Sequence, residues 1–554
     1  MPSSASAAQW VAGTIIVCIL GISYVYYPVF ASGFQVVTGD MFDAKIMVAI
    51  LEHWHNVLRF QASPWTVNYF YPYPGTLAYC VGLILTGIPY SVFRTLGADP
   101  FLSYELTNWT VRIIGAIGVI VVSQRFFRVG FFWAMAAGLF MLIATNMAAM
   151  MGHAQLSLAA LIPFGLALFH RTFTVMQMER LQPRTVGYIL AFAGFVGLWA
   201  LTEFYTLFTF CLFICLYFAG LNVLSAHFRT QTISIISLKI WRVAGLFVCM
   251  ALAVALVLKV YGPALGAQHS VEQVRELSGS ILSFFNIGSS NALWSSLLSQ
   301  PYLNIIDEPL ADRWAYGYTP IFGMAFVTSV LWLAQKYYHD RTDQAVARAL
   351  ALAIAAAVIC LLSVRIGGYA MWEPFFRYVP GAQVVRVPVR MILIISPIII
   401  IVTFFGLSRA FSEAKAPLHS PVIIALLLVM IAGQHRTATA FKLNRTDEVS
   451  YLASLPPAPD ECQSFYAGNP RIAPTGNPGI DALYLHSVDA MVIAEVRDIP
   501  TINGMATFVP EGWNLVSPDT PDYDARAKAY AEGNGINDGL CRLDLTQGIW
   551  TGAQ

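Results

Sequence analysis

Residues Trp10 to Phe30 read WVAGTIIVCILGISYVYYPVF, an apolar run without a charged residue. A helix needs about 20 mostly apolar residues to cross the hydrocarbon core of a bilayer. The run is too long for the apolar part of a cleavable signal peptide, and no basic stretch precedes it. We therefore expect a retained first membrane span, which leads into the acidic segment Gly39-Asp40-Met41-Phe42-Asp43.

The rest of the chain has a similar apolar character. Of 554 residues, 57% are hydrophobic and 11% are charged, whereas a soluble globular chain carries about 25% charged residues. We expect an α-helical polytopic membrane protein with about 11 transmembrane helices and additional interfacial helices. The ten further spans are expected near Trp109 to Val122, Phe131 to Met150, Leu156 to Phe169, Val186 to Ala200, Phe204 to Gly220, Val243 to Leu258, Ile321 to Ala334, Ala349 to Val364, Met391 to Phe405 and Pro421 to Gly433.

Basic residues gather at alternate span ends, which by the positive-inside tendency face the cytoplasm. The outer loops 31–108, 261–320 and 365–390 and the tail after residue 435 then lie together outside. Because loop 31–108 must begin and end outside, the apolar stretch Thr76 to Val92 is expected to lie along the interface or to dip in and out, not to cross. The five basic clusters are Arg125 with Arg128; Arg171, Arg180 and Arg184; Arg229, Lys239 and Arg242; Lys336, Arg341 and Arg348; and Arg409 with Lys415.

The tail differs sharply from the preceding part of the chain. Residues 436–554 are rich in scattered Pro, Gly, Asp and Asn and contain no run long enough to span. We expect two domains, a transmembrane domain over residues 1–435 and a small soluble extracytoplasmic α/β domain over residues 436–554. Ala490 to Ala494 is a strand candidate and Ala525 to Ala531 a helix candidate.

Two of the eight cysteines, Cys462 and Cys541, lie outside the apolar runs. In an oxidising compartment they would form a disulfide, and the alternative is two unrelated free thiols. The formal net charge of +1 provides no concentrated basic surface, so no nucleic-acid partner is expected.

Asp40 and Asp43 belong to the densest polar cluster of the amino-terminal half. Their spacing would place both carboxylates on one side of the first turn of a helix that begins near Phe42. A carboxylate at the lipid boundary can accept a proton from a substrate hydroxyl. The alternative is an Asp that caps an interfacial helix through the free amides of its first turn.

Further candidates follow in the same outer loop. Glu52, His53 and Arg59 are candidates for substrate binding from one helix, although the histidine spacing there does not suit zinc. Tyr71 and Tyr73 lie in a proline-rich stretch that excludes a helix interior, and their rings suit either an interfacial belt or a wall for a sugar ring.

Polar residues at other outer loops complete the candidate set. His153 and Gln155 form a corner between two spans, and Glu203 lies at another corner. A lone histidine at such a corner is also a common loop residue. Arg386 and Arg390 stand at the outer mouth of a span, against the positive-inside tendency, and so favour an anionic partner such as phosphate. Their alternative is to extend to lipid headgroups.

In this order and on one outer face, the motifs resemble those of the C-type superfamily of integral membrane glycosyltransferases (GT-C), in particular its poorly characterised bacterial branch. The resemblance covers most of the membrane region. The motifs are Gly39-Asp40-Met41-Phe42-Asp43, Leu51-Glu52-His53, Tyr71-Pro72-Tyr73-Pro74, Gly152-His153-Ala154-Gln155 and Pro380-Gly381 through Arg386-Val387-Pro388-Val389-Arg390.

The resemblance implies an inverting sugar transfer from a polyprenyl-phosphate donor to a glycan, lipid or protein acceptor at the outer face of a bacterial cytoplasmic membrane. Asp40 would be the base, with Asp43 as substitute or helper, and Arg386 and Arg390 would contact the donor phosphate. The sequence requires no cofactor; some relatives use a divalent metal, which nothing in this sequence indicates.

Two other functions remain open at this stage. A polysaccharide or lipid-carrier transporter or flippase would be expected to hold ionisable groups midway along its spans and often shows inverted repeats. Here nearly all charges lie at span ends and no repeat is visible. A non-catalytic assembly protein that uses its tail as a binding module is the third possibility, and product formation by the isolated protein would distinguish it.

Overall fold

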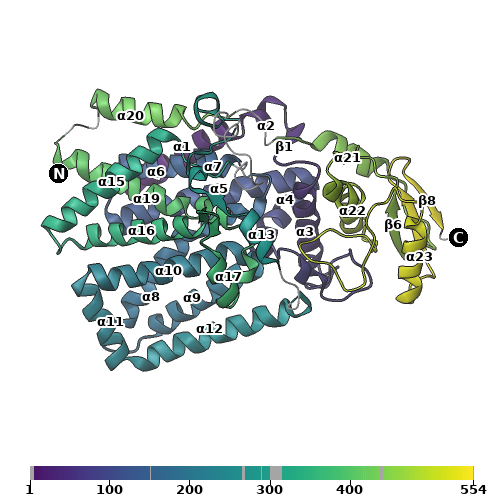
Figure 1. Cartoon of the computed structure of the whole chain (residues 1–554), viewed down its shortest axis with the longest axis horizontal. Helices are drawn as coiled ribbons and strands as arrows, with labels where there is room; N and C mark the ends of the chain where they lie inside the picture. The colour runs from purple at the N-terminus through teal and green to yellow at the C-terminus, as the bar shows by residue number, and fades with distance from the viewer. Residues whose placement is uncertain are drawn as a thin grey trace.

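A long bundle of apolar helices makes up most of the protein (Figure 1). The computed structural model describes residues 5–149, 151–264, 269–288, 290–299, 315–415, 417, 419–436 and 441–552. Within these residues, nine helical segments are long and apolar enough to cross a membrane. They are α1 (Ala7–Val25), α5 (Pro100–Phe127), α6 with α7 (Phe131–Ala149), a 3-10 turn with α8 (Ala154–Met176), α9 (Pro183–Thr202), α10 (Phe204–Leu224), α12 (Ile240–Val260), α16 (Gln344–Leu362) and α19 (Ser396–Glu413). The chain is therefore a multi-pass membrane protein.

Two more helices lie where spans were expected. α15 (Pro320–His339) has 20 residues, and α20 (Pro421–Ala432) is a shorter apolar helix of 12 residues. The expected span that ends at Met150 coincides with α6 and α7, although Met150 itself is outside the described residues. Thr76 to Val92 becomes a 3-10 turn (Thr76–Tyr79) followed by α4 (Ile84–Thr95), whose 12 residues reach only about 18 Å at 1.5 Å per residue, too short to cross.

Local sequence explains where several of these helices begin. Asp99 and Asp343 accept hydrogen bonds from the first free amides of α5 and α16 through their side chains. Proline at the first turn of α5 and α9 removes an amide that would have no partner inside the helix. These residues determine where each helix begins along the chain, and so where the loops between the helices start and end.

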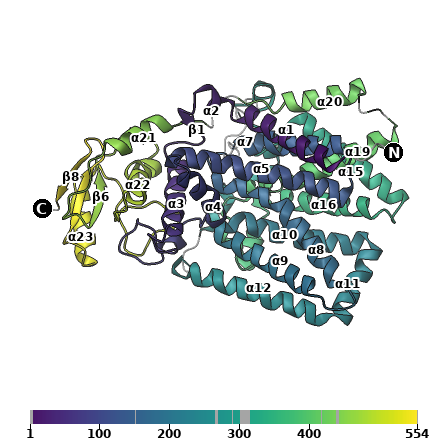
Figure 2. The same ribbon diagram turned by 180° about the vertical axis from the view of Figure 1, so that it is seen from behind.

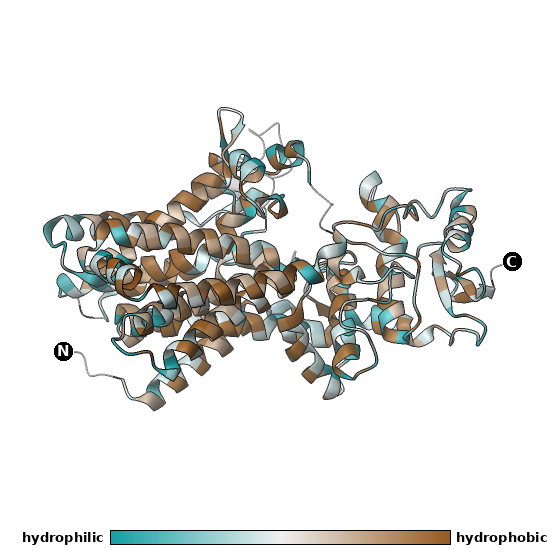
Figure 3. Cartoon of the chain, turned by 90° about the horizontal axis from the view of Figure 1, so that it is seen from below, coloured by the Kyte–Doolittle hydropathy of each residue, from teal (hydrophilic) through white to brown (hydrophobic). Residues whose placement is uncertain are grey.

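The polar ends of the bundle differ from its middle, as hydropathy colouring shows (Figure 3). α11 (Ala226–Leu238) and the turn between α15 and α16, which hold two of the five basic clusters, lie at the end remote from the carboxyl-terminal residues (Figures 1 and 2). The amino-terminal helix α1 starts at the same end. This arrangement agrees with a bundle whose basic end and carboxyl-terminal end face opposite sides of a bilayer.

The carboxyl-terminal residues form a small α/β unit at the other end of the bundle. Strands β6 (Ser464–Gly468), β7 (Leu540–Asp544) and β8 (Ile549–Gly552) form a sheet in that order, with β6 parallel and β8 antiparallel to β7. Its helices are α21 (Arg445–Ser454), α22 (Pro478–Arg497) and α23 (Tyr523–Gly533). Cys462 and Cys541 are joined in a disulfide. This unit is called the carboxyl-terminal unit below.

One strand prediction in this unit is wrong. Ala490 to Ala494 lies inside α22, all of it buried, whereas Ala525 to Ala531 lies inside α23 as expected. A short apolar run has the same pattern in a buried strand and in a helix that is enclosed on all sides, so periodicity could not separate the two.

The carboxyl-terminal unit shares one hydrophobic core with the first outer loop. This core includes Val48, Tyr69 and Tyr104 from the loop region together with Phe465 and Val492 from the unit. β1 (Val36–Val37) pairs with β5 (Leu443–Asn444), and α3 (Asp43–Leu58) stands between the bundle and α22 (Figures 1 and 2). The unit is therefore packed against the loop as one body and does not hang from a linker.

The other two outer loops also meet. β2 (Gly279–Ser280) pairs with β3 (Val364–Ile366), which pairs with β4 (Tyr369–Ala370). Glu373, at the start of α17 (Glu373–Tyr378), accepts hydrogen bonds from Arg275 and Arg377. Within the expected loop 261–320, residues 265–268, 289 and 300–314 are outside the described residues.

Candidate active site

The acidic segment after the first span is held in a fixed conformation by α5. Glu105, buried in α5, accepts hydrogen bonds from the amide and the hydroxyl of Thr38 at 2.8 and 3.1 Å. Gly39 follows with φ of +101°, and a Cβ there would stand 2.3 Å from the Cβ of Ala44. Only glycine avoids both the strained backbone and this contact. The next residue, Asp40, accepts a hydrogen bond from the Phe42 amide at 3.0 Å, a turn that leads into α3.

Asp43 is the point where several polar groups converge. It is the first residue of α3, and one third of its side chain is exposed. Its Oδ2 lies 3.2 Å from Nδ1 of His153, and the Tyr484 hydroxyl lies close to its carboxylate. Burial raises the pKa of Asp43, while the charge of Arg390, the Tyr484 hydroxyl and the charge of Arg386 act in the opposite direction.

His153 is suited to act as a neutral donor to Asp43. Burial and the charge of Arg390 lower its pKa to about 3, although the nearby Asp40 opposes this shift. At neutral pH the imidazole is therefore uncharged, so Nδ1–H can point at Asp43 and leave Nε2 as an acceptor. The predicted corner at Gly152 to Gln155 thus brings its histidine to the acidic segment.

Arg386 and Arg390 supply the positive charge. Arg386 lies just before the 3-10 turn Pro388–Arg390, and Arg390 is the last residue of this turn, which leads into α18 (Met391–Ile394). Tyr205 fixes this stretch by donating its hydroxyl to the Val387 carbonyl at 2.5 Å, and Nε of Arg390 donates to the Tyr316 hydroxyl at 3.4 Å.

The guanidinium of Arg386 makes no hydrogen bond or ion pair with any residue that the structure describes. Burial and the charge of Arg390 lower its pKa, and Asp43 and Tyr484 act in the opposite direction. A half-buried cation without a fixed acceptor, beside a second cation, is an arrangement that an anion would stabilise.

Glu203 borders the same group from the corner between α9 and α10. Its carboxylate accepts hydrogen bonds from the amides of Tyr205 and Thr206 at 2.9 and 2.5 Å, which caps α10. Burial raises its pKa to about 6, and the charge of Arg390 opposes that shift. The geometry gives this predicted ligand a capping role next to the cations.

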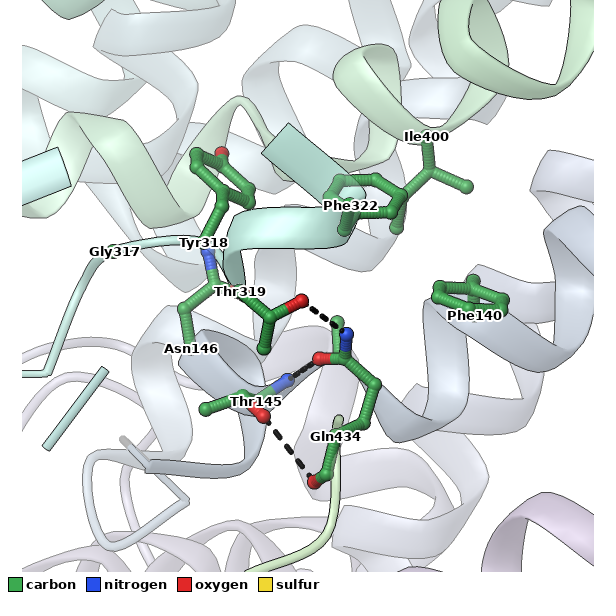
Figure 4. A pocket seen from close by; sticks show the side chains of 10 residues that line it. Phe140, Thr145, Asn146, Gly317, Tyr318, Thr319, Phe322, Ile400 and Gln434 are labelled. Carbon is green, nitrogen blue, oxygen red and sulfur yellow. Dashed lines mark hydrogen bonds between the residues drawn. The ribbon is translucent and has the colours of Figure 1, made fainter. Parts of the chain in front are cut away.

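A buried network of polar side chains, called the polar knot below, ties several helices of the bundle together (Figure 4). The Thr145 amide donates to Oε1 of Gln434 at 2.9 Å, and Nε2 of Gln434 donates to the Thr319 hydroxyl at 2.8 Å. Asn146 donates to the Ser396 hydroxyl at 2.9 Å. The cavity beside this knot has a volume of about 10 Å³, room for about one water molecule. The knot joins α7, α15, α19 and α20, so it supports the site without offering space for a substrate.

Three residues predicted to bind substrate, on or just after α3, do not contact the cluster around Asp43. The buried carboxylate of Glu52 is bound by Arg94, at 2.8 Å from Nε, and by the Tyr90 hydroxyl at 2.6 Å. His53 is fully buried, with Nδ1 at 3.6 Å from Glu495. Arg59 is exposed at the far end of α3. These positions assign Glu52 and His53 to the packing of the loop and leave Arg59 outside the cluster around Asp43.

The aromatic candidates Tyr71 and Tyr73 form their hydrogen bonds elsewhere. The Tyr71 carbonyl accepts a hydrogen bond from Tyr530, and the Tyr73 hydroxyl donates to the Glu511 carbonyl at 3.0 Å. Both tyrosines therefore contact the carboxyl-terminal unit. Oε1 of Gln155 is buried without a hydrogen-bond partner among the described residues.

Tyr484 is the site residue that sequence reasoning missed. It lies on α22, in a region where the sequence carried no motif, and only the packing of α22 on α3 brings it to Asp43. Among the residues that the structure describes, no three His, Cys, Asp or Glu side chains are grouped so that they could hold a metal ion.

Comparison with known proteins identifies the fold. No family model and no curated protein matches the chain. Among solved structures, the oligosaccharyltransferase of Archaeoglobus fulgidus, solved with zinc and sulfate, matches 96% of this chain and 67% of its own, at 12% identity and a TM-score of 0.52. The arabinofuranosyltransferase AftD of Mycobacteria matches 98% of this chain at 15% identity and a TM-score of 0.52.

A further structure of the Archaeoglobus fulgidus oligosaccharyltransferase, in complex with an inhibitory peptide and a dolichol-phosphate, matches with a TM-score of 0.51 and 11% identity over 96% of this chain and 69% of its own. The chain spans about one third of AftD, at 35% of that protein's length. At these identities the likeness concerns the fold, and it is the one that the sequence motifs suggested. The chain therefore shares its fold with these solved membrane transferases, as its sequence resemblance to the C-type glycosyltransferases predicted.

Proposed function

We propose that this protein is a membrane glycosyltransferase that moves a sugar from a polyprenyl-phosphate donor to an acceptor hydroxyl. The observation that carries the proposal is the convergence of Asp43, His153, Arg386 and Arg390 at the non-basic end of a GT-C bundle. A carboxylate beside an anion-binding pair of arginines is the combination that transfer from a sugar phosphate requires.

The reaction is an inverting displacement. The acceptor oxygen attacks the anomeric carbon and forms the new glycosidic bond, while the bond from that carbon to the phosphate oxygen breaks. The electron pair leaves with the polyprenyl phosphate, whose charge Arg386 and Arg390 stabilise. The acceptor proton passes to a carboxylate of the protein and then to solvent.

Asp43 is the stronger candidate for the base. Burial raises its pKa, which makes its carboxylate a better proton acceptor, and His153 and Tyr484 fix its orientation. Asp40, which the sequence suggested first, uses one oxygen to hold the turn before α3. We assign Asp40 to the shape of the acidic segment and to the electrostatic field around His153.

The outer face of the cytoplasmic membrane is the proposed place of reaction. α11 and the turn between α15 and α16, with two of the basic clusters, lie at the end of the bundle remote from α3 (Figure 1), and the disulfide between Cys462 and Cys541 suits an oxidising compartment. Both observations support an extracytoplasmic carboxyl-terminal unit and a lipid-linked donor that enters from the outer leaflet.

The donor site can be tested without knowledge of the sugar or the acceptor. A neighbour of this fold was solved with dolichol-phosphate, so the probe is a polyprenyl phosphate added to the purified protein in nanodiscs. Arg386→Gln should weaken binding at least tenfold, because a charge-assisted contact is lost. Arg59→Gln is the matched control and should bind as the wild type does. No saturable binding by the wild type, or equal loss in both variants, would overturn the assignment.

A further inference from the structure

We propose that Tyr484, on α22 of the carboxyl-terminal unit, is a positioning residue for Asp43, so that this unit is an integral part of the active site. Its catalytic meaning rests on the proposed function, but the contact itself does not. The ring of Tyr484 meets that of Phe42 edge-on, with centroids 5.8 Å apart and an interplanar angle of 86°. This ring contact places its hydroxyl beside the carboxylate of the next residue, Asp43, which it influences electrostatically.

This contact holds Asp43 from the side opposite to the membrane bundle. His153 approaches the carboxylate from the corner before α8, at 3.2 Å, and Tyr484 approaches it from α22. A carboxylate with donors from two separate elements has little freedom to rotate, which preserves the direction of its remaining lone pairs. The base would therefore be oriented jointly by the membrane region and the carboxyl-terminal unit.

A buried ionic quartet holds α22 in register with α3 at this point. The ammonium of Lys45, with a side chain 1% exposed, lies 2.9 Å from Glu448 and also contacts Asp489. Arg471 binds Asp489, at 2.9 Å between Nε and Oδ2, and contacts Glu448 as well. The quartet contains two positive and two negative charges, so each buried charge is compensated. Lys45 follows Asp43 by two positions on α3, and its partner Asp489 is on α22 together with Tyr484. A shift of α22 that moved Tyr484 away from Asp43 would therefore also separate the buried charges of Lys45 and Asp489.

The same two helices are joined again at their far ends. Nδ2 of Asn56 donates to the Glu495 carbonyl at 2.9 Å, and the Asn68 amide donates to the Glu495 carboxylate at 2.8 Å. Because α3 and α22 are joined both between Lys45 and Asp489 and between Asn56 and Glu495, Tyr484 is held in one place relative to Asp43. The position of Tyr484 on α22 relative to Asp489 and Glu495 therefore determines how close Tyr484 lies to Asp43.

The charged and titratable groups around Asp43 define the expected pH behaviour. They are His153 from the corner before α8, Arg386 and Arg390 from the stretch that leads into α18, Tyr484 from α22, and Asp40 from the turn before α3. A base must be ionised, so activity should rise with pH through the pKa of Asp43. A hydroxyl that donates to the carboxylate favours the ionised form, so its removal should raise this pKa and move the acidic limb to higher pH.

The first test compares two conservative variants of the full-length protein. Tyr484→Phe should move the acidic limb of kcat upward by roughly half a unit or more and lower kcat about tenfold, with donor KM little changed. Tyr530→Phe is the matched control, because its hydroxyl donates to the Tyr71 carbonyl at the same interface without contacting Asp43. An acidic limb that stays in place in Tyr484→Phe, or moves equally in the control, would overturn the proposal.

A second measurement does not depend on activity. The melting temperatures of wild type, Asp43→Asn, Tyr484→Phe and the double variant form a double-mutant cycle. The shift of the double variant should be smaller than the sum of the single shifts, because both single changes remove the same contact. Additive shifts would reject the contact. Non-additive shifts in a wild-type protein that transfers no sugar would uphold the contact and reject the proposed function.

Discussion

Gly39 shows how much of the site depends on one residue. The backbone passes through φ of +101° immediately before Asp40, and the position of a Cβ is already taken by Ala44. The acidic segment can therefore turn into α3 only at a glycine. The sequence shows that this glycine precedes the two aspartates. Only the structure shows that its backbone has a positive φ, which other residues rarely adopt.

Gly39→Ala should lower both activity and stability, because the clash with Ala44 and the left-handed backbone displace the Asp40 to Asp43 turn. We expect a loss of about 1–3 kcal/mol in the free energy of unfolding and at least a tenfold drop in transfer. Gly33→Ala is the control, since Gly33 also has a positive φ but open space around its Cβ. Thermal unfolding and initial rates of both variants would check this. Equal effects in the two variants would show that space around Gly39 is not limiting.

Charge and topology predicted part of the polar cluster around Asp43. Asp43, His153, Arg386 and Arg390 carry polar groups at span ends on one side of the membrane, and the structure brings them together. Glu52 and His53 have the same composition and lie in the same loop, but they face Arg94 and Glu495. Patterns in a single sequence predict on which side of the membrane a residue lies, but they do not predict the direction in which its side chain points. Tyr484 could not be found in this way, because its role depends on tertiary packing.

At the scale of elements, α22 determines more than the sequence indicated. Its apolar run Ala490 to Ala494 favoured a strand, yet the run is the inner part of a 20-residue helix packed on α3. Nine of the eleven expected spans, in contrast, coincide within the described residues with helices long and apolar enough to cross, because lipid requires about 20 apolar residues whatever the tertiary contacts. The contrast arises because a helix buried inside the carboxyl-terminal unit has no comparable length requirement.

The link between α3 and α22 should be sensitive to Lys45. Lys45→Met leaves the buried carboxylates of Glu448 and Asp489 with Arg471 alone, which should lower stability by about 3–5 kcal/mol. Lys336→Met is the control, because its ion pair with Glu413 is exposed and is expected to contribute at most about 1 kcal/mol. Chemical or thermal unfolding monitored from the carboxyl-terminal unit would measure both. A Lys45 variant as stable as the control would contradict the role of the quartet.

The quartet also predicts a pH dependence of stability. Burial alone would raise the pKa of Asp489, but the charges of Lys45 and Arg471 lower it below its ordinary value. The stabilisation by these pairs should therefore be complete above the ordinary pKa of an aspartate, about 4, and be lost as pH falls through the lowered value. The Lys45→Met variant should lose less stability than the wild type over that acid range. Parallel pH curves for the two proteins would contradict this.

At the scale of the whole molecule, the fold divides the membrane region into a basic end and an end that carries the site. The disulfide between Cys462 and Cys541 closes a sequence separation of 79 residues in the carboxyl-terminal unit. Its removal by Cys462→Ser with Cys541→Ser should cost about 2–5 kcal/mol in that unit. Reductant should lower the melting temperature of the wild type and leave the double variant unchanged. A reductant effect of equal size in both would show that the disulfide does not form.

The central claim is that Asp43 is the base of a sugar transfer from a lipid phosphate. The most direct test is transfer by purified full-length protein in nanodiscs, with a panel of labelled polyprenyl-phosphate sugars and a membrane extract as the source of acceptors. Asp43→Asn keeps the size of the side chain and removes its basicity, so transfer should fall at least a hundredfold while polyprenyl-phosphate binding persists. Asp40→Asn should keep a larger part of the rate. Transfer by Asp43→Asn at the wild-type rate would contradict the account.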